Sequence, residues 1–171
     1  MSSLGWQLAV AEALVGNGVT VATFVPDHRL QGILDALNET EMLMRPLARE
    51  EECVAYAAGQ RLAGGRPVVL MQTSGLGNCL NSLSSLAIPY TLGVPMVVSV
   101  RGALGEKNPA QVLMGRTATE LMALLGVQSF SVRDASNAAA VVNGICDLAY
   151  AAGQCAAAML EPELGGSRAS S

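Results

Sequence analysis

The amino-acid sequence predicts an α/β fold: a single doubly wound domain with a mainly parallel sheet of about six strands and helices on both faces. Three observations favour this fold. Strand-like and helix-like segments alternate along the whole chain. The strand-like segments are continuous apolar runs, as expected when a parallel sheet is covered on both faces. The chain has 171 residues, 51% of them hydrophobic, which suits one compact domain with a sizeable core.

The expected helices show apolar residues at helical spacing or runs of small residues, and turn residues close several of them. Gly16-Asn17-Gly18 close the first helix, and Gly64-Gly65 close the third. In chain order, the expected helices cover residues 4–14, 29–37, 50–62, 78–87, 117–125 and 135–152.

The expected strands are short apolar runs, the first of which stops at Pro26. Polar or glycine-rich loops follow the third and fourth strands, at residues 73–77 and 101–109. The domain is expected to span residues 1–164, followed by a flexible tail of small polar residues at 165–171. In chain order, the expected strands cover residues 19–25, 42–47, 67–72, 95–100, 128–132 and 155–160.

The composition argues against several classes of protein. A net charge of −4 gives no electrostatic reason to expect a nucleic-acid partner. The four cysteines have no CxxC spacing and His28 is the only histidine, so no metal site is expected in this chain. No signal sequence is visible, and the longest apolar runs are too short to span a membrane. We therefore expect a soluble cytoplasmic protein. Only 14% of the residues are charged, and this low share indicates assembly with other chains.

Four polar loops are predicted to meet at the carboxyl ends of the strands, where parallel sheets bind their ligands. They contain Asp27 and His28, then Arg49-Glu50, then residues 73–78, and finally residues 101–109. The segment Thr73-Ser74-Gly75-Leu76-Gly77-Asn78 has two interpretations. It is either a tight turn with Asn78 capping the next helix, or a cradle for an anion or cofactor. It lacks the Lys-Ser/Thr ending of a P-loop and is not GxGxxG.

The run Arg49-Glu50-Glu51-Glu52 also has two interpretations. Acidic residues at the start of a helix are commonly solvated and suit the helix dipole. Glu50, however, lies where strand meets helix, and the small residues after it allow close packing on another surface. A carboxyl group buried there against a partner would have a raised pKa and could donate a proton.

Two further side chains, His28 and Arg101, are candidates for contact with a substrate. His28 is the only side chain here that titrates near neutral pH. Arg101 ends a buried strand at the ligand edge and is the best candidate to hold a carboxylate or sulfonate, although Arg101, Lys107 and Arg116 could equally be surface charges.

Taken together, these segments resemble the pyrimidine-binding domain of thiamine-diphosphate-dependent decarboxylases, most closely the sulfopyruvate and phosphonopyruvate decarboxylases. The resemblance runs from about residue 19 to residue 117, with the motifs in the same order and spacing. The matching segments are Phe24-Val25-Pro26-Asp27, Arg49-Glu50 with Ala57-Ala58-Gly59, Met71-Gln72-Thr73-Ser74-Gly75-Leu76-Gly77-Asn78, and Val100-Arg101-Gly102.

The resemblance implies that Glu50 bonds N1′ of the thiamine diphosphate pyrimidine and so activates the cofactor. It also implies two groups of binding residues: Thr73, Ser74, Gly75 and Asn78 at the cofactor, and Asp27, His28 and Arg101 at the substrate. His28 is a second candidate catalytic residue, although some relatives have serine at its position. The family's Gly-Asp-Gly motif is absent from the sequence, so the diphosphate and its Mg²⁺ are expected on a beta-type partner subunit. Self-association through the pyrimidine domain is expected as well.

The leading functional hypothesis is the alpha-type subunit of an enzyme that decarboxylates an anionic 2-oxo acid. Sulfopyruvate is the first choice of substrate and phosphonopyruvate the second, because the phosphonopyruvate enzyme is usually one fused chain. A different thiamine-diphosphate-dependent 2-oxo acid enzyme is an alternative. A non-catalytic anion- or nucleotide-binding α/β module is the alternative from another class.

Overall fold

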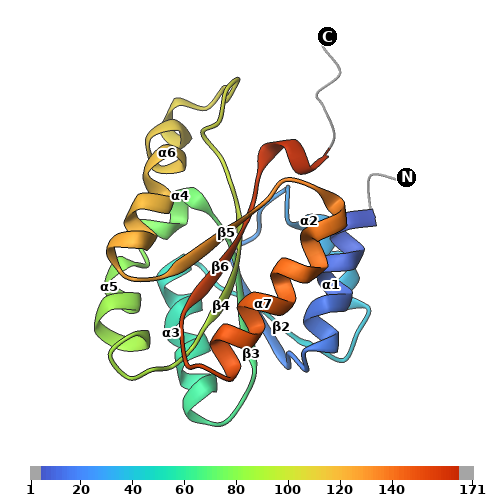
Figure 1. Cartoon of the computed structure of the whole chain (residues 1–171), viewed down its shortest axis with the longest axis vertical. Coiled ribbons are helices and arrows are strands. Elements are labelled where there is room, and N and C mark those ends of the chain that lie inside the picture. Colours follow the sequence, from blue (N-terminus) through green and yellow to red (C-terminus); the bar gives the residue numbers. More distant parts are fainter. Residues whose placement is uncertain (1–4, 166–171) are drawn as a thin grey trace.

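A six-stranded sheet forms the centre of the computed structural model, which describes residues 5–165 (Figure 1). All its strand pairs are parallel, in the order β2-β1-β3-β4-β6-β5. The chain places β2 on one side of β1 and all later strands on the other, so the sheet is doubly wound as predicted. The strands are β1 (Val21–Phe24), β2 (Leu43–Pro46), β3 (Pro67–Gln72), β4 (Pro95–Ser99), β5 (Gln128–Val132) and β6 (Ala156–Leu160).

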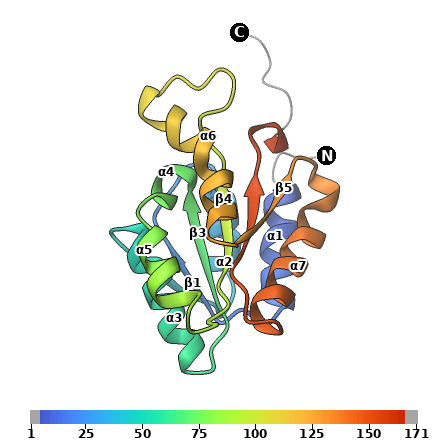
Figure 2. The same ribbon diagram turned by 60° about the vertical axis from the view of Figure 1, so that its left-hand side comes forward.

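Helices cover both faces of the sheet, and Figure 2 shows α1 and α7 on one side with α3 and α5 on the other. The first face carries α1 (Gly5–Gly16), α2 (Gln31–Asn38) and α7 (Ala138–Tyr150). The second face carries α3 (Glu50–Leu62), α4 (Thr73–Leu76), α5 (Leu80–Ser82), the π-helical turn η1 (Leu83–Ala87) and α6 (Pro109–Leu124).

Alternation along the strands divides the core into two apolar clusters. In β3, Val68 and Leu70 pack with the first helical layer, whereas Val69 and Met71 pack with the second. The central strand β4 is buried at every position, while the edge strands β2 and β5 are largely exposed. This pattern explains why the central strands are continuous apolar runs.

Three expectations about helices need correction. Residues 73–77 were expected as a loop, but Thr73–Leu76 is one turn of helix, α4. Asn78 does not cap the next helix: Cys79 directly precedes α5, no side chain caps it, and Asn78 is exposed. Finally, α6 begins at Pro109 rather than at residue 117. Its N-cap Asn108 accepts a hydrogen bond from Ala110 N at 3.1 Å, and Pro109 has the φ angle that the first turn requires.

The ends of the chain are described in part. A 3-10 turn, η2 (Ala135–Asn137), precedes α7, and another, η3 (Pro162–Gly165), follows β6. The expected tail lies outside the described residues except for Gly165. Within residues 5–165, no helix is both long and apolar enough to cross a bilayer.

Candidate functional site

The predicted site residues gather at the carboxyl ends of the parallel strands. Asp27 and His28 follow β1, Thr73 and Ser74 follow β3, and Arg101 follows β4. Because the sheet order reverses between β1 and β3, the crevice between their carboxyl ends is the expected ligand site of this fold.

Glu50 is the first residue of α3 and differs from the two glutamates after it. Glu51 pairs with Arg49, at 2.5 Å from Oε1 to Nε. Glu52 Oε2 accepts the backbone N–H groups of Ala48 and Arg49, each at 3.2 Å, and so caps the helix. In the described part of the chain the half-buried Glu50 side chain makes no hydrogen bond or ion pair. Its carboxyl group is therefore available to a ligand or partner.

The Glu50 side chain lies against Gly75 of α4. A Cβ atom on residue 75 would overlap Cγ, Cδ and Oε1 of Glu50, so only glycine leaves room for the carboxyl group here. The two predicted cofactor-binding segments, at Glu50 and at residues 73–78, thus lie in direct contact. Burial, followed by the negative charge of Glu50, raises the pKa of Cys53 to about 12.

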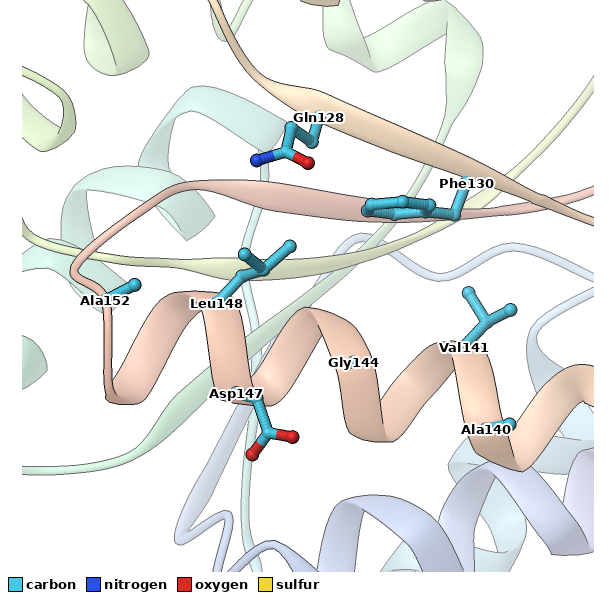
Figure 3. Close-up of a pocket in the computed structure, with 8 residues that line it drawn as sticks. All are labelled: Gln128, Phe130, Ala140, Val141, Gly144, Asp147, Leu148 and Ala152. Atoms are coloured by element: carbon cyan, nitrogen blue, oxygen red, sulfur yellow. The ribbon is translucent and has the colours of Figure 1, made fainter.

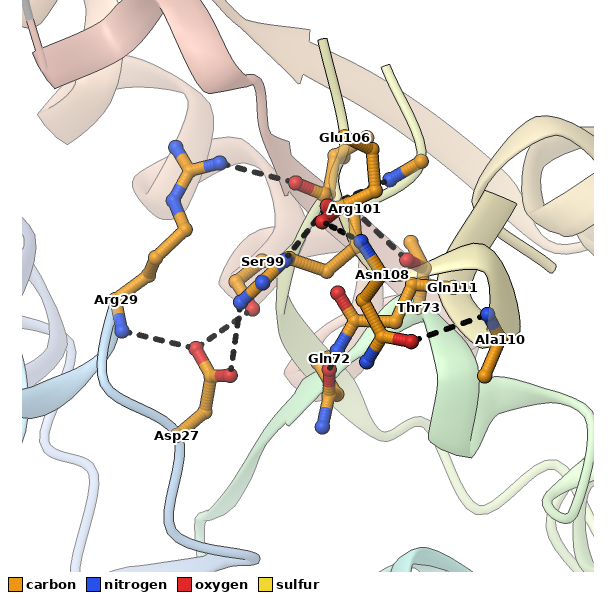
Figure 4. Close-up of polar contacts among 12 residues, drawn as sticks. Asp27, Arg29, Gln72, Thr73, Ser99, Arg101, Glu106, Asn108, Ala110 and Gln111 are labelled. Carbon is orange, nitrogen blue, oxygen red and sulfur yellow. Dashed lines mark hydrogen bonds and ion pairs between the residues drawn. The ribbon is translucent and has the colours of Figure 1, made fainter. Parts of the chain in front are cut away.

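A buried network joins the loops after β1, β3 and β4 (Figure 4). Asp27 is 9% exposed, and its Oδ1 accepts hydrogen bonds from Ser99 Oγ and Arg29 N, both at 3.0 Å. Its Oδ2 lies 3.7 Å from Arg101 Nη1. The hydroxyl of Thr73, which is fully buried, accepts a hydrogen bond from Arg101 N at 3.0 Å.

This network fixes Arg101 at both ends, since Asp27 contacts the guanidinium and Thr73 holds the backbone. Asp27 and Thr73 therefore use their polar atoms to position Arg101. Among the other loop residues predicted to bind cofactor, Ser74 is half-buried, Gly75 is buried under Glu50 and Asn78 is exposed.

A hollow of about 220 Å³ lies beside this network, and both His28 and Arg101 line it. Arg29, which the sequence analysis did not single out, lines it too. The Arg29 guanidinium donates hydrogen bonds to Val100 O at 3.0 Å and to Glu161 O at 2.9 Å. Burial, and then the nearby positive charge of Arg101, lower the pKa of Arg29. Its place directly after His28, in a loop at the ligand edge, was the signal that could have identified it.

A larger hollow lies elsewhere, between the edge strand β5 and helix α7 (Figure 3). Its volume is about 640 Å³, and its lining includes Phe130, Val141 and Leu148. Figure 3 shows the carboxylate of Asp147 directed away from the strand. The lining of this groove is mainly apolar and carries no cationic side chain, so the smaller, charged hollow is the better candidate site.

None of the described residues forms a cluster of three or more His, Cys, Asp or Glu side chains suited to a metal ion. The four cysteines are separate, buried free thiols.

Comparisons with known proteins identify the family of this chain. The family model for the thiamine pyrophosphate enzyme N-terminal TPP binding domain matches residues 7–103. Sulfopyruvate decarboxylase subunit alpha of Methanothermobacter thermautotrophicus is 33% identical over 90% of this chain and 93% of that protein. The protein of the same name from Methanococcus maripaludis is 33% identical, covering 82% of this chain and 84% of that one. Phosphonopyruvate decarboxylase of Streptomyces viridochromogenes is 32% identical over 72% of this chain but only 32% of that longer protein.

Two solved structures share the fold at low sequence identity. A 2-oxoglutarate:ferredoxin oxidoreductase from Magnetococcus marinus has a TM-score of 0.73 and 13% identity, over 94% of this chain and 29% of that one. A split-gene transketolase, solved as an inactive beta4 tetramer, has a TM-score of 0.67 and 17% identity, over 92% of this chain and 50% of that one. The family match covers more than half of the chain, and the two sulfopyruvate decarboxylase alpha subunits align with it over most of both lengths. This chain belongs to the thiamine pyrophosphate enzyme family and contains its N-terminal TPP binding domain.

Proposed function

We propose that this chain is the alpha-type subunit of a thiamine-diphosphate-dependent decarboxylase that converts sulfopyruvate to sulfoacetaldehyde and carbon dioxide. The relatives named as alpha subunits of sulfopyruvate decarboxylase match nearly end to end, at 90% of this chain and 93% of the protein from Methanothermobacter. The pyrimidine-binding domain is proposed to span residues 1–164.

The observation that carries the proposal is the position of Glu50 over Gly75. A half-buried carboxyl group without an ionic partner in the described chain suits the role of bonding N1′ of a pyrimidine ring. The residues present therefore fit the cofactor. When bound, thiamine diphosphate supplies a nucleophilic carbon and accepts the electrons released as carbon dioxide leaves.

The other residues divide into two groups in this proposal. Ser74, Gly75 and Asn78 contact the cofactor. Thr73 belongs to the same segment, and its main role is to hold the backbone of Arg101. His28 and Arg101 face the substrate in the charged hollow, where His28 is placed to exchange a proton and Arg101 to bind an anionic group. Asp27 serves the substrate site by orienting Arg101.

A beta-type subunit is proposed to supply what this chain lacks. No Gly-Asp-Gly sequence occurs in the 171 residues, so we assign the diphosphate group and its Mg²⁺ to the partner. Apolar side chains on and near α6 remain exposed, with Leu104, Leu113 and Leu124 at 104%, 69% and 83%. Exposed leucines of this kind suit burial against the partner or a second copy of this chain. The buried free thiols suit a reducing cytoplasm, where we place the complex.

Phosphonopyruvate is the second candidate substrate, because a phosphonopyruvate decarboxylase is also among the relatives, at 32% identity. Phosphonopyruvate carries the same kind of charged groups as sulfopyruvate, so the charged hollow does not discriminate between the two substrates. The sulfopyruvate decarboxylase alpha subunits align over more of this chain, 82% and 90% against 72%, and so favour sulfopyruvate.

Co-expression with a partner chain that contains Gly-Asp-Gly tests the proposal. Carbon dioxide release is measured from sulfopyruvate, phosphonopyruvate, pyruvate and benzoylformate, with the complex and with the isolated chain. We expect activity from the complex alone, and sulfopyruvate as the best substrate. Turnover by the isolated chain, or a complex inactive on every 2-oxo acid, would contradict the proposal.

A further inference from the structure

Two arginines and a glutamate line the charged hollow at the carboxyl edge of the sheet, and the proposed function uses only one of the three. Arg101 has been assigned to the substrate. Arg29 lies across from it, and Glu106 approaches from the loop between β4 and α6. At about 220 Å³, the hollow is smaller than the pockets that take drug-sized ligands, which range from roughly 300 to 1,000 Å³. It suits a small, charged molecule.

The Glu106 carboxylate contacts three donors, two of them on Arg101 and Gly102, which line the hollow, and the third on Asn108. Oε2 lies 3.4 Å from Arg101 Nε and 3.4 Å from Gly102 N, while Oε1 accepts Asn108 N at 3.0 Å. The hydrogen bond from Asn108 lowers the pKa of Glu106, opposed by burial and helped by Gly102 and Arg101. The group is therefore an anion bound by an arginine and a backbone N–H, which is the arrangement that recognises a carboxylate or sulfonate.

Arg29 provides a second, rigid cation on the same hollow. Its guanidinium is tied to Val100 O and Glu161 O, so two of its five N–H donors are used and three remain. Because the group is held in place, few conformations are lost when it binds a ligand. Figure 4 shows the backbone nitrogen of Arg29 beside Asp27 and the Arg29 guanidinium directed away from that carboxylate.

We propose that Arg29 and Arg101 together hold the two anionic groups of a small dicharged 2-oxo acid, and that the Glu106 carboxylate occupies the Arg101 and Gly102 donors until the substrate displaces it. The inference rests on the proposed function and extends it to substrate class. A dianion brings a second charge that competes with Glu106 for these donors. A monoanion brings none, so Glu106 also discriminates against substrates such as pyruvate.

Binding of sulfoacetate, a stable molecule with one carboxylate and one sulfonate, tests this directly. Arg29, Arg101 and Glu106 all belong to this chain, so the full-length chain is titrated calorimetrically with sulfoacetate and with acetate. Glu106→Gln removes the competing charge, and we expect sulfoacetate to bind roughly tenfold more tightly and acetate to gain as well. Arg29→Met removes a charged donor, and sulfoacetate should bind roughly ten- to hundredfold more weakly.

Matched variants guard against general effects of charge and folding. Glu120→Gln on α6 and Arg133→Met after β5 alter exposed side chains outside the hollow and should leave binding unchanged. Arg29→Lys keeps the charge without the planar fork and should give intermediate affinity. Thermal unfolding of each variant establishes that it is folded before it is titrated. If Arg29→Met does not fold, the affinity of Arg29→Lys for sulfoacetate is used in its place.

The proposal is wrong if Glu106→Gln binds sulfoacetate no better than the original chain, or if neither Arg29 variant binds it more weakly. Failure of the proposed function looks different. In that case the complex releases no carbon dioxide from any 2-oxo acid, whereas the pattern of sulfoacetate affinities across the variants remains.

Discussion

The carboxyl group of Glu50 lies over Gly75, in the space that a side chain at position 75 would fill. Glu50 begins a helix after β2, and Gly75 belongs to the helical turn after β3. Their contact brings together two segments that the sequence presents as separate motifs. It also gives a steric reason for glycine at position 75, which the sequence alone does not reveal.

Gly75→Ala should therefore displace Glu50 and disable the enzyme without unfolding the chain. The added Cβ overlaps the far part of a flexible side chain, which can rotate away at modest cost. We expect carbon dioxide release by the complex to fall to the level of a Glu50 variant, with thermal unfolding nearly unchanged. Gly59→Ala in α3 is the control, because nothing lies within 4 Å of its added Cβ. Full activity of Gly75→Ala would show that the position of Glu50 is unimportant.

Glu50→Gln should abolish turnover while largely preserving cofactor binding. The amide keeps the shape of the side chain but cannot donate the carboxyl proton to the pyrimidine ring. General acid–base groups contribute about 10² to 10⁴-fold, and a loss of that size is expected in kcat. Glu51→Gln and Glu52→Gln should change kcat little, because Glu51 pairs with Arg49 and Glu52 caps the helix. Equal effects of all three changes would overturn the assignment of Glu50.

Much of the fold could be predicted from the sequence because the apolar pattern and the turn residues specify it locally. The six strands and their parallel arrangement follow from buried apolar runs between helices. The start of α6 was missed because Asn108-Pro109 ends a polar segment that resembles a loop. Only the capping contact with Ala110 shows that a helix begins there. The turn of helix at residues 73–76 contains glycine, which disfavours helix in isolation.

The candidate site could be predicted only in part, for a reason that Arg29 illustrates. Its guanidinium contacts carbonyls 71 and 132 residues further along the chain, which no local pattern encodes. Asp27 shows the same limit, because its buried contact with Ser99 joins residues 72 positions apart. Motifs identify the loops that meet, whereas the partners of each side chain depend on tertiary packing.

Gly115→Ala should destabilise the chain. Gly115 lies in α6, and its added Cβ would overlap the backbone carbonyl of Arg101, so the helix must shift. Overpacking of this kind costs about 1 to 3 kcal/mol in the free energy of unfolding. Gly144→Ala in α7 is the matched control, because nothing lies within 4 Å. It should instead stabilise by about 0.5 to 1 kcal/mol, since alanine favours helix. Urea denaturation of both variants measures this, and shifts of the same sign would contradict it.

The buried cysteines should make the chain less stable in alkaline solution. Burial, and then the charge of Asp147, raise the pKa of Cys146 from 9.0 to about 12. The unfolded chain therefore loses this proton at lower pH than the folded chain, so stability is complete below about pH 9 and falls between pH 9 and 12. Unfolding free energies in urea at pH 9, 10 and 11 should decrease in that order, and Cys146→Ala should reduce the slope. An identical slope in the variant would count against a buried neutral thiol.

Arg101→Ala should raise KM for sulfopyruvate and phosphonopyruvate far more than it alters turnover of pyruvate. Arg101 is held between Asp27 and Thr73 and faces the charged hollow, so it is positioned to bind an anion rather than to react. Loss of a hydrogen bond to a charged group costs about 1.5 to 3 kcal/mol, which corresponds to a roughly ten- to hundredfold rise in KM. Lys107→Ala and Arg116→Ala change exposed cations of the neighbouring loop and helix and should have small effects. Steady-state kinetics of the complex with each substrate measures these effects. Equal losses on all three substrates would mean that Arg101 supports the fold of the site, and that the partner subunit binds the distal anion.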